Sequence, residues 1–396
     1  MKRKISLFLV LFSLTYLCYS ENSINPKDSL KENNLAPLSS VLSEDGTINT
    51  DAKISASFNP AGYKMITQPG KAPRFVQIDE INNRVAGDEF WENPYTVSSF
   101  ASSSTVYAIA VDGTNIYVGG AFFDLAGDPN ADNIAKWDGT KWIGMGTGGS
   151  NGNIYAITVY NSDVYAGGYF STIGGLTTDN IAQWDNSLNT WYAMGSGVNG
   201  VVRALAVYGG TIYAGGLFTS ASGVANTNHI AKFSSSWTAL GTGTDDEVDA
   251  IVADGSGNIY VGGNFTNAGG IINTSRIAKW NGATWSALGI GMDYGVQAIA
   301  INGTEIYAGG FFTLAGGIAA NNLAKWNGSS WSSVPGIAGG AVNALKFVGT
   351  DLYVGGAFSS AGGIPNTNCI AKWSGTSWSA LGTGLNWNVF ALTPQD

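Results

Sequence analysis

Histidine and cysteine are almost absent from this sequence of 396 residues. It has one histidine, His229, and two cysteines, Cys18 and Cys369. A single histidine excludes metal sites built from several histidines. Because Cys18 lies in a segment that we expect to be removed, Cys369 would have no disulfide partner, and the mature chain must be stabilised by packing.

The sequence also lacks an apolar run long enough to cross a bilayer, which takes about 20 residues. Its apolar stretch over residues 5–17 follows three basic residues and precedes small residues at positions 18 and 20. This pattern predicts a secretory signal peptide over residues 1–20. The alternative is a lipoprotein anchored through Cys18. Both interpretations place the protein outside the cytoplasm, as a secreted or cell-surface protein without a transmembrane segment.

Positive charge is scarce. Lys and Arg number 19 against 28 Asp and Glu, which gives a formal net charge of −9, and signal cleavage would remove three further positive charges. An acidic surface without basic runs makes nucleic acids and anionic membranes poor partners. Residues 21–60 are rich in Ser, Asn, Asp and Lys, and they predict a flexible polar tether.

Glycine, by contrast, is abundant, with 55 residues, and much of it belongs to an internal repeat. Each copy holds four short β-type runs: A (Val-x-Ala-Ile-x-Val), B (Ile-Tyr-x-Gly-Gly), C (Ile-Ala-Lys-Trp) and D (Trp-x-x-Leu/Met-Gly). Dipeptides such as Asp112-Gly113 and Asn281-Gly282 supply the positive φ that tight hairpins need. Four antiparallel strands repeated at this period are typical of a β-propeller blade. The Tyr of run B recurs every 46 to 48 residues, at positions 117, 165, 213, 260, 307 and 353.

The ends of the repeat array bear on the number of blades. Residues 388–392 repeat run A alone, and residues 84–91, ending in Trp91, look like degraded runs C and D. A blade shared by both termini would join the last sheet of a circular fold to the first. The sequence therefore predicts an all-β propeller over residues 61–396, with six clear repeats over 106–387 and a seventh blade split between the termini. Six blades are the alternative.

The Gly-Gly of run B, followed by paired aromatic residues in runs C and D, resembles kelch repeats over roughly residues 80–394. The resemblance implies a propeller of the galactose-oxidase type, with repeats like those of bacterial secreted and surface proteins. Kelch propellers include enzymes, adaptors and adhesins, so the resemblance implies no single function. The copper-radical oxidases of this fold need two histidines, which the chain lacks. Trp137 and Trp280 also stand where kelch units usually have Tyr.

Most of the remaining aromatic and nucleophilic residues have a structural interpretation. Eleven of the 13 tryptophans recur at fixed places in runs C and D, which predicts packing between neighbouring sheets. His229 and Cys369 stand just before run C, where other copies hold Asn or Arg. A place filled so variously indicates a loop edge, so we assign no catalytic residue.

Strand parity predicts which face binds a partner. In a four-stranded antiparallel blade, the A–B and C–D turns lie on one face and the longer B–C and D–A loops on the other. The copies differ in these longer loops, and binding residues are expected on loops held by a rigid frame. The candidate ligand-binding residues are Trp387, Tyr294, Asp293, Asp245, Asp246 and Glu247.

Carboxylates in the first B–C loop raise the question of a metal. Asp124, Asp128 and Asp132 could hold Ca²⁺ through their oxygen atoms, although their spacing is not that of an EF-hand. Solvated loop charge is the competing interpretation, and no other cofactor is expected.

Two functions remain open at this point. The favoured one is a monomeric, non-enzymatic propeller, secreted or surface-exposed, that binds a protein or a glycan on the B–C and D–A loop face. The alternative is a polysaccharide hydrolase or lyase that uses loop carboxylates. Binding is favoured because the loop carboxylates form no pair that the sequence can place about 5 to 9 Å apart.

Overall fold

The structure is a computed structural model that describes residues 104–395 and, ahead of them, five short strands. The chain divides into two units, one of residues 15–94 and one of residues 1–14 and 95–396. In the smaller unit, β2 (Ala36–Pro37) pairs with β3 (Phe58–Asn59), and β4 (Tyr63–Ile66) pairs with β5 (Arg74–Gln77). The predicted signal peptide, the tether and Trp91 otherwise lie outside the described residues.

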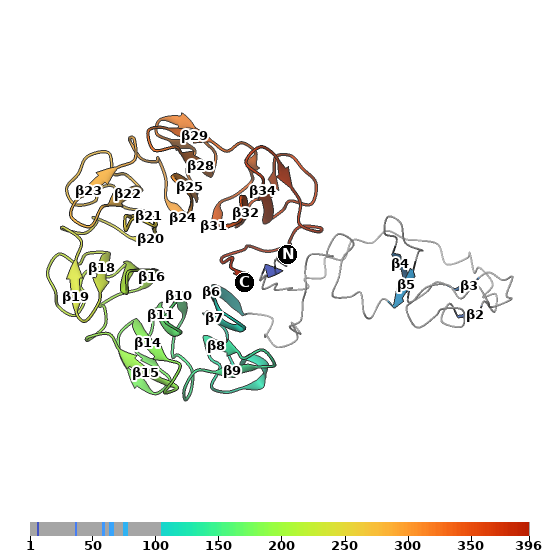
Figure 1. Ribbon diagram of the computed structural model, residues 1–396, viewed down its shortest axis with the longest axis horizontal. Coiled ribbons are helices and arrows are strands. Elements are labelled where there is room, and N and C mark those ends of the chain that lie inside the picture. Colours follow the sequence, from blue (N-terminus) through green and yellow to red (C-terminus); the bar gives the residue numbers. More distant parts are fainter. Residues whose placement is uncertain are drawn as a thin grey trace, which may run out of the picture. The chain divides into compact units, whose positions relative to one another are not determined.

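Runs A, B, C and D of each repeat form the four strands of one antiparallel sheet, and six such sheets form a ring (Figure 1). The first two blades are β6 (Thr105–Asp112), β7 (Asn115–Ala121), β8 (Ile134–Trp137) and β9 (Trp142–Gly144), then β10 (Ile154–Tyr160), β11 (Asp163–Gly168), β14 (Ile181–Asp185) and β15 (Thr190–Ala193). The third and fourth are β16 (Val202–Tyr208), β17 (Thr211–Gly216), β18 (Ile230–Phe233) and β19 (Trp237–Ala239), then β20 (Val248–Ala253), β21 (Ile259–Gly263), β22 (Ile277–Trp280) and β23 (Trp285–Ala287). The fifth and sixth are β24 (Val296–Asn302), β25 (Glu305–Gly310), β28 (Leu323–Trp326) and β29 (Trp331–Ser333), then β31 (Val342–Val348), β32 (Asp351–Gly356), β34 (Ile370–Trp373) and β35 (Trp378–Ser379).

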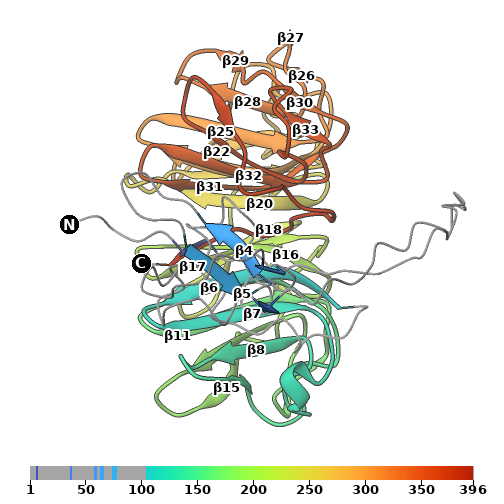
Figure 2. The same ribbon diagram turned by 90° about the vertical axis from the view of Figure 1, so that its right-hand side faces the viewer.

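The remaining elements are short and lie in loops or at the chain ends. Figure 2 shows the sheets from the side, with several of these small strands at their edges. A 3₁₀ turn, η3, spans Leu125–Gly127. The short strands are β12 (Thr172–Ile173), β13 (Leu176–Thr177), β26 (Leu314–Ala315), β27 (Ile318–Ala319), β30 (Ile337–Ala338), β33 (Ser360–Ala361) and β36 (Pro394–Gln395), which pairs with β1 (Ser6–Leu7). No helix in the part of the chain that the structure describes is long and apolar enough to cross a membrane.

The hydrophobic core lies between neighbouring blades. One cluster, for example, combines Tyr165 of the second blade with Val202, Phe218 and Trp237 of the third. The indole N–H of Trp237 also donates to the carbonyl of Met194 in the preceding blade, at 2.7 Å. The same bond recurs in four other blades, which confirms the structural interpretation of the run-D tryptophans.

The Gly-Gly pair of each B strand allows two close approaches. A Cβ on Gly262 would lie 2.5 Å from Val296 in the first strand of the next blade, and one on Gly263 would lie 2.1 Å from the carbonyl oxygen of Glu247. Real side chains do not tolerate such distances. The first Gly of the motif therefore lets each blade lie directly against the next, and the second lets strand B approach the start of strand A in its own blade.

Within the described residues the structure shows six complete blades, the number given as the alternative to seven blades with a split seventh. The C-terminal segment 388–392 nevertheless lies as the first strand of another blade would. Val389 is buried, and a Cβ added to Gly355 would lie 2.5 Å from its side chain. Val296 lies against Gly262 in the same way. Its N–H donates to the carbonyl of Gly356 at 3.1 Å. Residues 84–91, predicted to complete that blade, lie outside the described residues.

Candidate functional site

The predicted loop face carries the D–A loops, each of which leads into the first strand of the next blade. Tyr294 lies two residues before β24, and Trp387 lies two residues before Val389, so both occupy the same place in the repeat. Their side chains are 63% and 53% exposed. Two large aromatic side chains therefore reach solvent where other copies have Gly152, Gly200 or Asp246.

Asp245 and Asp293 sit one residue earlier in their loops and hold the neighbouring B–C loops in place. Asp245 accepts the N–H groups of Thr266 and Asn267 at 2.8 and 2.9 Å. Burial opposes ionisation, but the hydrogen bonds from Thr266 and Asn267 outweigh it and lower the pKa of Asp245. Asp293 makes the equivalent bonds to Thr313 and Leu314. The side chains of Asn151 and Asn199 make the same bonds in other blades, so this is a framework position.

The first strand of every blade has a β-bulge just below this face. In β6, Val106 pairs with Gly120 and Ala108 pairs with Gly119, so Tyr107 is an extra residue. Bulges turn a side chain out of the regular alternation of a strand, often next to a functional site. The six bulge residues are Tyr107, Tyr155, Arg203, Asp249, Gln297 and Asn343.

These six residues and Phe390, which takes the same place in segment 388–392, form what we call the inner ring. Their strands surround the centre of the propeller in Figure 1. The Tyr107 ring lies 5.0 Å from the Tyr155 ring and 5.5 Å from the Phe390 ring. The guanidinium of Arg203 stacks over Tyr155 at 4.9 Å. One side of the inner ring is thus a continuous aromatic arc that ends in a cation.

The neighbouring side of the inner ring is acidic. Arg203 Nε donates to Glu247 Oε1 at 2.8 Å, and the Glu247 side chain is 13% exposed. Asn264 Nδ2 lies 3.2 Å from Asp249 Oδ2 and 3.4 Å from Glu247 Oε2. Of the predicted acidic residues, Glu247 is therefore the one that the structure joins to the inner ring.

The environment of Asp249 favours its protonated form. Burial, followed by the charge of Glu247, raises the pKa of Asp249 to about 7, although Arg203 acts in the opposite direction. Asn264 bonds to both carboxyl groups. Near neutral pH, Asp249 is therefore only about half ionised beside the Arg203–Glu247 ion pair.

The sequence analysis did not predict the inner ring. The second residue of run A, Val-x-Ala-Ile, differs in every copy but the first two. In a regular strand this residue would point to the opposite face from its two neighbours, and no residue of run A indicates the bulge. In the structure, the second Gly of run B lies against the carbonyl of the residue just before strand A, next to the bulge.

Two of the three carboxylates proposed for Ca²⁺ accept hydrogen bonds from backbone groups. Asp128 accepts the N–H groups of Asn130 and Gly144 at 2.9 and 2.8 Å, and Asp132 accepts the N–H of Asp124 at 2.8 Å. Within residues 104–395, no group of three or more His, Cys, Asp or Glu residues is placed to hold a metal ion. The calcium hypothesis gains no support from this loop.

His229 and Cys369 lie at a position that adopts a left-handed backbone in all six blades, with φ of 60° and 61°. Asn133 shows why Asn is frequent there. Its side chain accepts the N–H of Phe122 at 3.2 Å and donates to the carbonyl of Ser150 at 2.8 Å. This agrees with the prediction of a loop-edge position.

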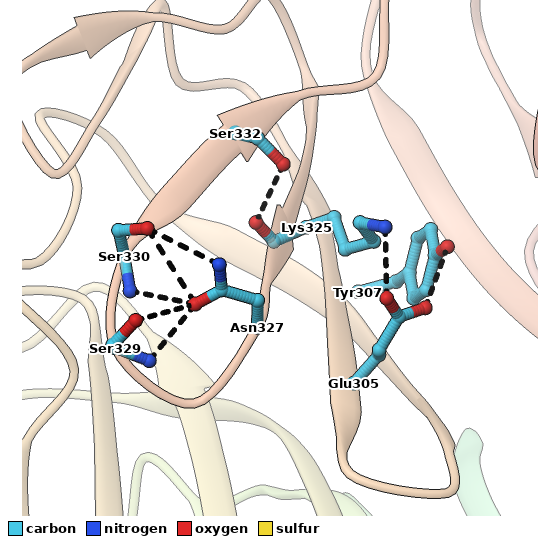
Figure 3. Close-up of polar contacts among 7 residues, drawn as sticks. All are labelled: Glu305, Tyr307, Lys325, Asn327, Ser329, Ser330 and Ser332. Atoms are coloured by element: carbon cyan, nitrogen blue, oxygen red, sulfur yellow. Dashed lines mark hydrogen bonds and ion pairs between the residues drawn. The ribbon is translucent and has the colours of Figure 1, made fainter.

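The opposite face consists of short turns whose polar groups bond to one another (Figure 3). Asn327 Oδ1 accepts the N–H groups of Ser329 and Ser330, both at 2.9 Å. Lys325 Nζ donates to Glu305 Oε1 at 2.8 Å, and the hydroxyl of Tyr307 lies 3.4 Å from Glu305 Oε2. These contacts lie within one blade.

Comparisons with known proteins support the fold. A family model described as the Rax2 C-terminal beta propeller domain matches residues 143–293. The extracellular domain of the putative one component system BT4673 from B. thetaiotaomicron is similar over 74% of this chain, with 13% identity and a TM-score of 0.50. This chain covers only 37% of that structure. The computationally designed Ika8 protein is 15% identical over 74% of this chain and 91% of its own, with a TM-score of 0.47.

A search of curated proteins found no match. At 13% identity, the similarity to the BT4673 domain shows the fold alone. The kelch-like and galactose-oxidase type stays a prediction.

Proposed function

We propose that the protein is a non-enzymatic binding propeller that acts outside the cytoplasm and recognises a protein or a glycan with its D–A and B–C loop face. One observation carries the proposal: Tyr294 and Trp387, at the same place of two different repeats, expose large aromatic side chains to solvent. Exposed aromatic residues on a rigid frame are frequent centres of binding energy. The proposed location rests on the predicted signal peptide of residues 1–20.

The acidic pair gives the alternative, a polysaccharide hydrolase or lyase, a specific basis. A carboxyl group with a pKa near 7 can serve as a general acid. However, Glu247 is paired with Arg203 at 2.8 Å, and Nδ2 of Asn264 lies within 3.4 Å of both carboxyl groups. The carboxyl groups of glycosidases instead stand about 5 to 9.5 Å apart with the glycosidic bond or a water between them. Because protein groups already engage both carboxyl groups here, binding is the better-supported function.

The test is an array of glycans and extracellular proteins probed with the mature chain, followed by affinity measurements on the best partner. Trp387→Ala and Tyr294→Ala should each weaken binding by about 2 kcal/mol without changing the melting temperature. Asn281→Ala and Asn327→Ala, on the opposite face, should leave the affinity unchanged. The reverse pattern would refute the proposed face. Turnover of a polysaccharide that is lost in Glu247→Gln or Asp249→Asn would establish the enzymatic alternative.

A further inference from the structure

We propose that the inner ring holds a neutral sugar residue of a glycan, with its apolar face toward the Tyr107–Tyr155–Phe390 arc and its hydroxyl groups toward Glu247, Asp249 and Asn264. This proposal deepens the proposed function, on which it rests, by naming the ligand class and a site that the loops alone do not define.

The aromatic arc supplies the apolar half of such a site. Tyr107 contacts both of its neighbours in the arc, and Phe390 is 39% exposed. The three residues come from the first two blades and the C-terminal segment, so no single repeat could form this surface. A pyranose ring presents C–H groups on one face and hydroxyl groups at its edge. That face matches a partly exposed aromatic surface.

The acidic side supplies directional hydrogen bonding. Carboxylates accept hydrogen bonds, a protonated carboxyl and an amide also donate them, and a sugar hydroxyl does both. Asn264 already holds Glu247 and Asp249 in place through bonds to both. A ligand there would meet groups that are ordered beforehand, which lowers the entropic cost of binding.

The Arg203–Glu247 ion pair favours a neutral ligand. Arg203 is paired with Glu247 at 2.8 Å, so neither charge is free to attract an ion of its own. Arg203 is also fixed against Tyr155, which joins the aromatic arc to the acidic side. An acidic or basic ligand would need one of these contacts to break, whereas a hydroxyl group can bond to the pair as it stands.

Calorimetric titration of the full chain with methyl glycosides of glucose, galactose, mannose and N-acetylglucosamine tests the proposal. At least one should bind with a dissociation constant below 10 mM. Its charged counterparts, glucosamine and glucuronate, should bind at least ten-fold more weakly. Affinity for the neutral sugar should not change between 50 and 500 mM NaCl, because salt screens only charged contacts.

Two variants place the sugar. Tyr155→Leu, which removes a ring of the arc, and Asp249→Leu, which removes polar groups from the acidic side, should each lower the affinity at least ten-fold. Tyr192→Leu is the matched control, since Tyr192 is an exposed tyrosine on the outermost strand β15. Melting curves of all three proteins establish that they are folded.

The outcomes separate this proposal from the proposed function. If no neutral glycoside binds, or if a bound one is insensitive to both inner-ring variants, the inner-ring proposal is overturned. Should the array partner still depend on Trp387 and Tyr294 in that case, the binding propeller stands without it. Preference for glucosamine or for a lysine-rich peptide would likewise overturn the neutral-sugar assignment.

Discussion

The two faces of the propeller differ in how their polar groups are used. On the turn face, the same kind of residue recurs in blade after blade and bonds to its own turn: Asp138 and Asn327 both accept the backbone N–H groups two and three residues ahead. Asn186 adds a bond from the second blade to Tyr117 of the first. On the loop face, the residue types change from one repeat to the next, and some of these side chains bond between blades. Arg203 of the third blade, for instance, pairs with Glu247 at the entry to the fourth. Residues that repeat in every blade stabilise the individual blade. Residues that differ between blades are the ones that can form a site shared by several blades.

The comparison also separates two kinds of loop-face residue. Asp245 and Asp293 look unrepeated by residue type but repeat the function of Asn151 and Asn199. Tyr294, Trp387 and the inner ring have no such counterparts. The first kind belongs to the scaffold and the second is available for a ligand.

The largest expected loss of stability comes from removing the C-terminal segment 388–396, which packs against the sixth blade. Deleting residues 388–396 uncovers Gly355 and the core around it, because Val389 is buried there. Loss of one such apolar side chain alone costs about 2 kcal/mol, which corresponds to a fall in melting temperature of roughly 5 °C. An exposed strand edge should also promote self-association.

Deletion of residues 393–396 is the control, because it leaves Val389, Phe390 and Leu392 in place. Thermal melts and sedimentation velocity compare the two truncations with the full chain. An unchanged melting temperature and monomeric state in the longer truncation would show that this segment does not close the ring.

An intermediate effect is expected from pH, with opposite sign on the two faces. The pKa of Asp249 is raised to about 7, above its value in the unfolded chain, so the folded state holds a proton that the unfolded state has lost. Stability should therefore decrease as pH rises from about 4 to about 7. Asp249→Asn removes this loss, and its melting temperature should exceed the parent's by several degrees at pH 8 but match it near pH 4. The charged groups that act on Asp249 are Glu247, Arg203 and Asp246.

Asp138, on the turn face, is the matched comparison. The hydroxyl of Thr140, followed by the N–H groups of Lys141 and Thr140, lowers the pKa of Asp138 to about 2. Its contribution is present above about pH 4 and lost as the pH falls toward 2. Asp138→Ala should thus be slightly less stable than the parent at pH 7 and equal to it near pH 2. Thermal melts of both variants and the parent over this pH range provide the measurement. The two pKa directions would be contradicted if both variants became more stable, or both less stable, relative to the parent as the pH rises.

The fold could be predicted from the sequence because its signals are repeated, whereas the site could not because its signals are not. Six copies of Tyr-x-Gly-Gly specify the blades, their strand order and the face that carries the long loops. A comparison of the six copies does not reveal Tyr155 and Asp249, because the residue type at their position varies from copy to copy. The structure describes six complete blades, and the split seventh blade stays a prediction: Val389 and Leu392 continue the array, while residues 84–91 lie outside the described residues. The framework bonds of Asp245 could not be predicted from the sequence, because Thr266 and Asn267 lie some 20 residues further along the chain.

The smallest effect is expected from Asp245→Asn, which tests whether Asp245 belongs to the scaffold or contacts the ligand. In Asp245→Asn, the amide can accept the N–H groups of Thr266 and Asn267 as the carboxylate does. It can also donate to the hydroxyl of Thr266, as Asn199 Nδ2 donates to Thr219 Oγ1 at 2.9 Å. The free energy of unfolding should therefore change by no more than about 0.5 kcal/mol, and affinity for any partner of the loop face should be preserved. Thermal melts and titrations of this variant beside Tyr294→Ala give the measurement. A large loss of affinity with an unchanged melt would mean that the carboxylate itself contacts the ligand, and Asp245 would then belong with Tyr294 and Trp387 and not with the scaffold.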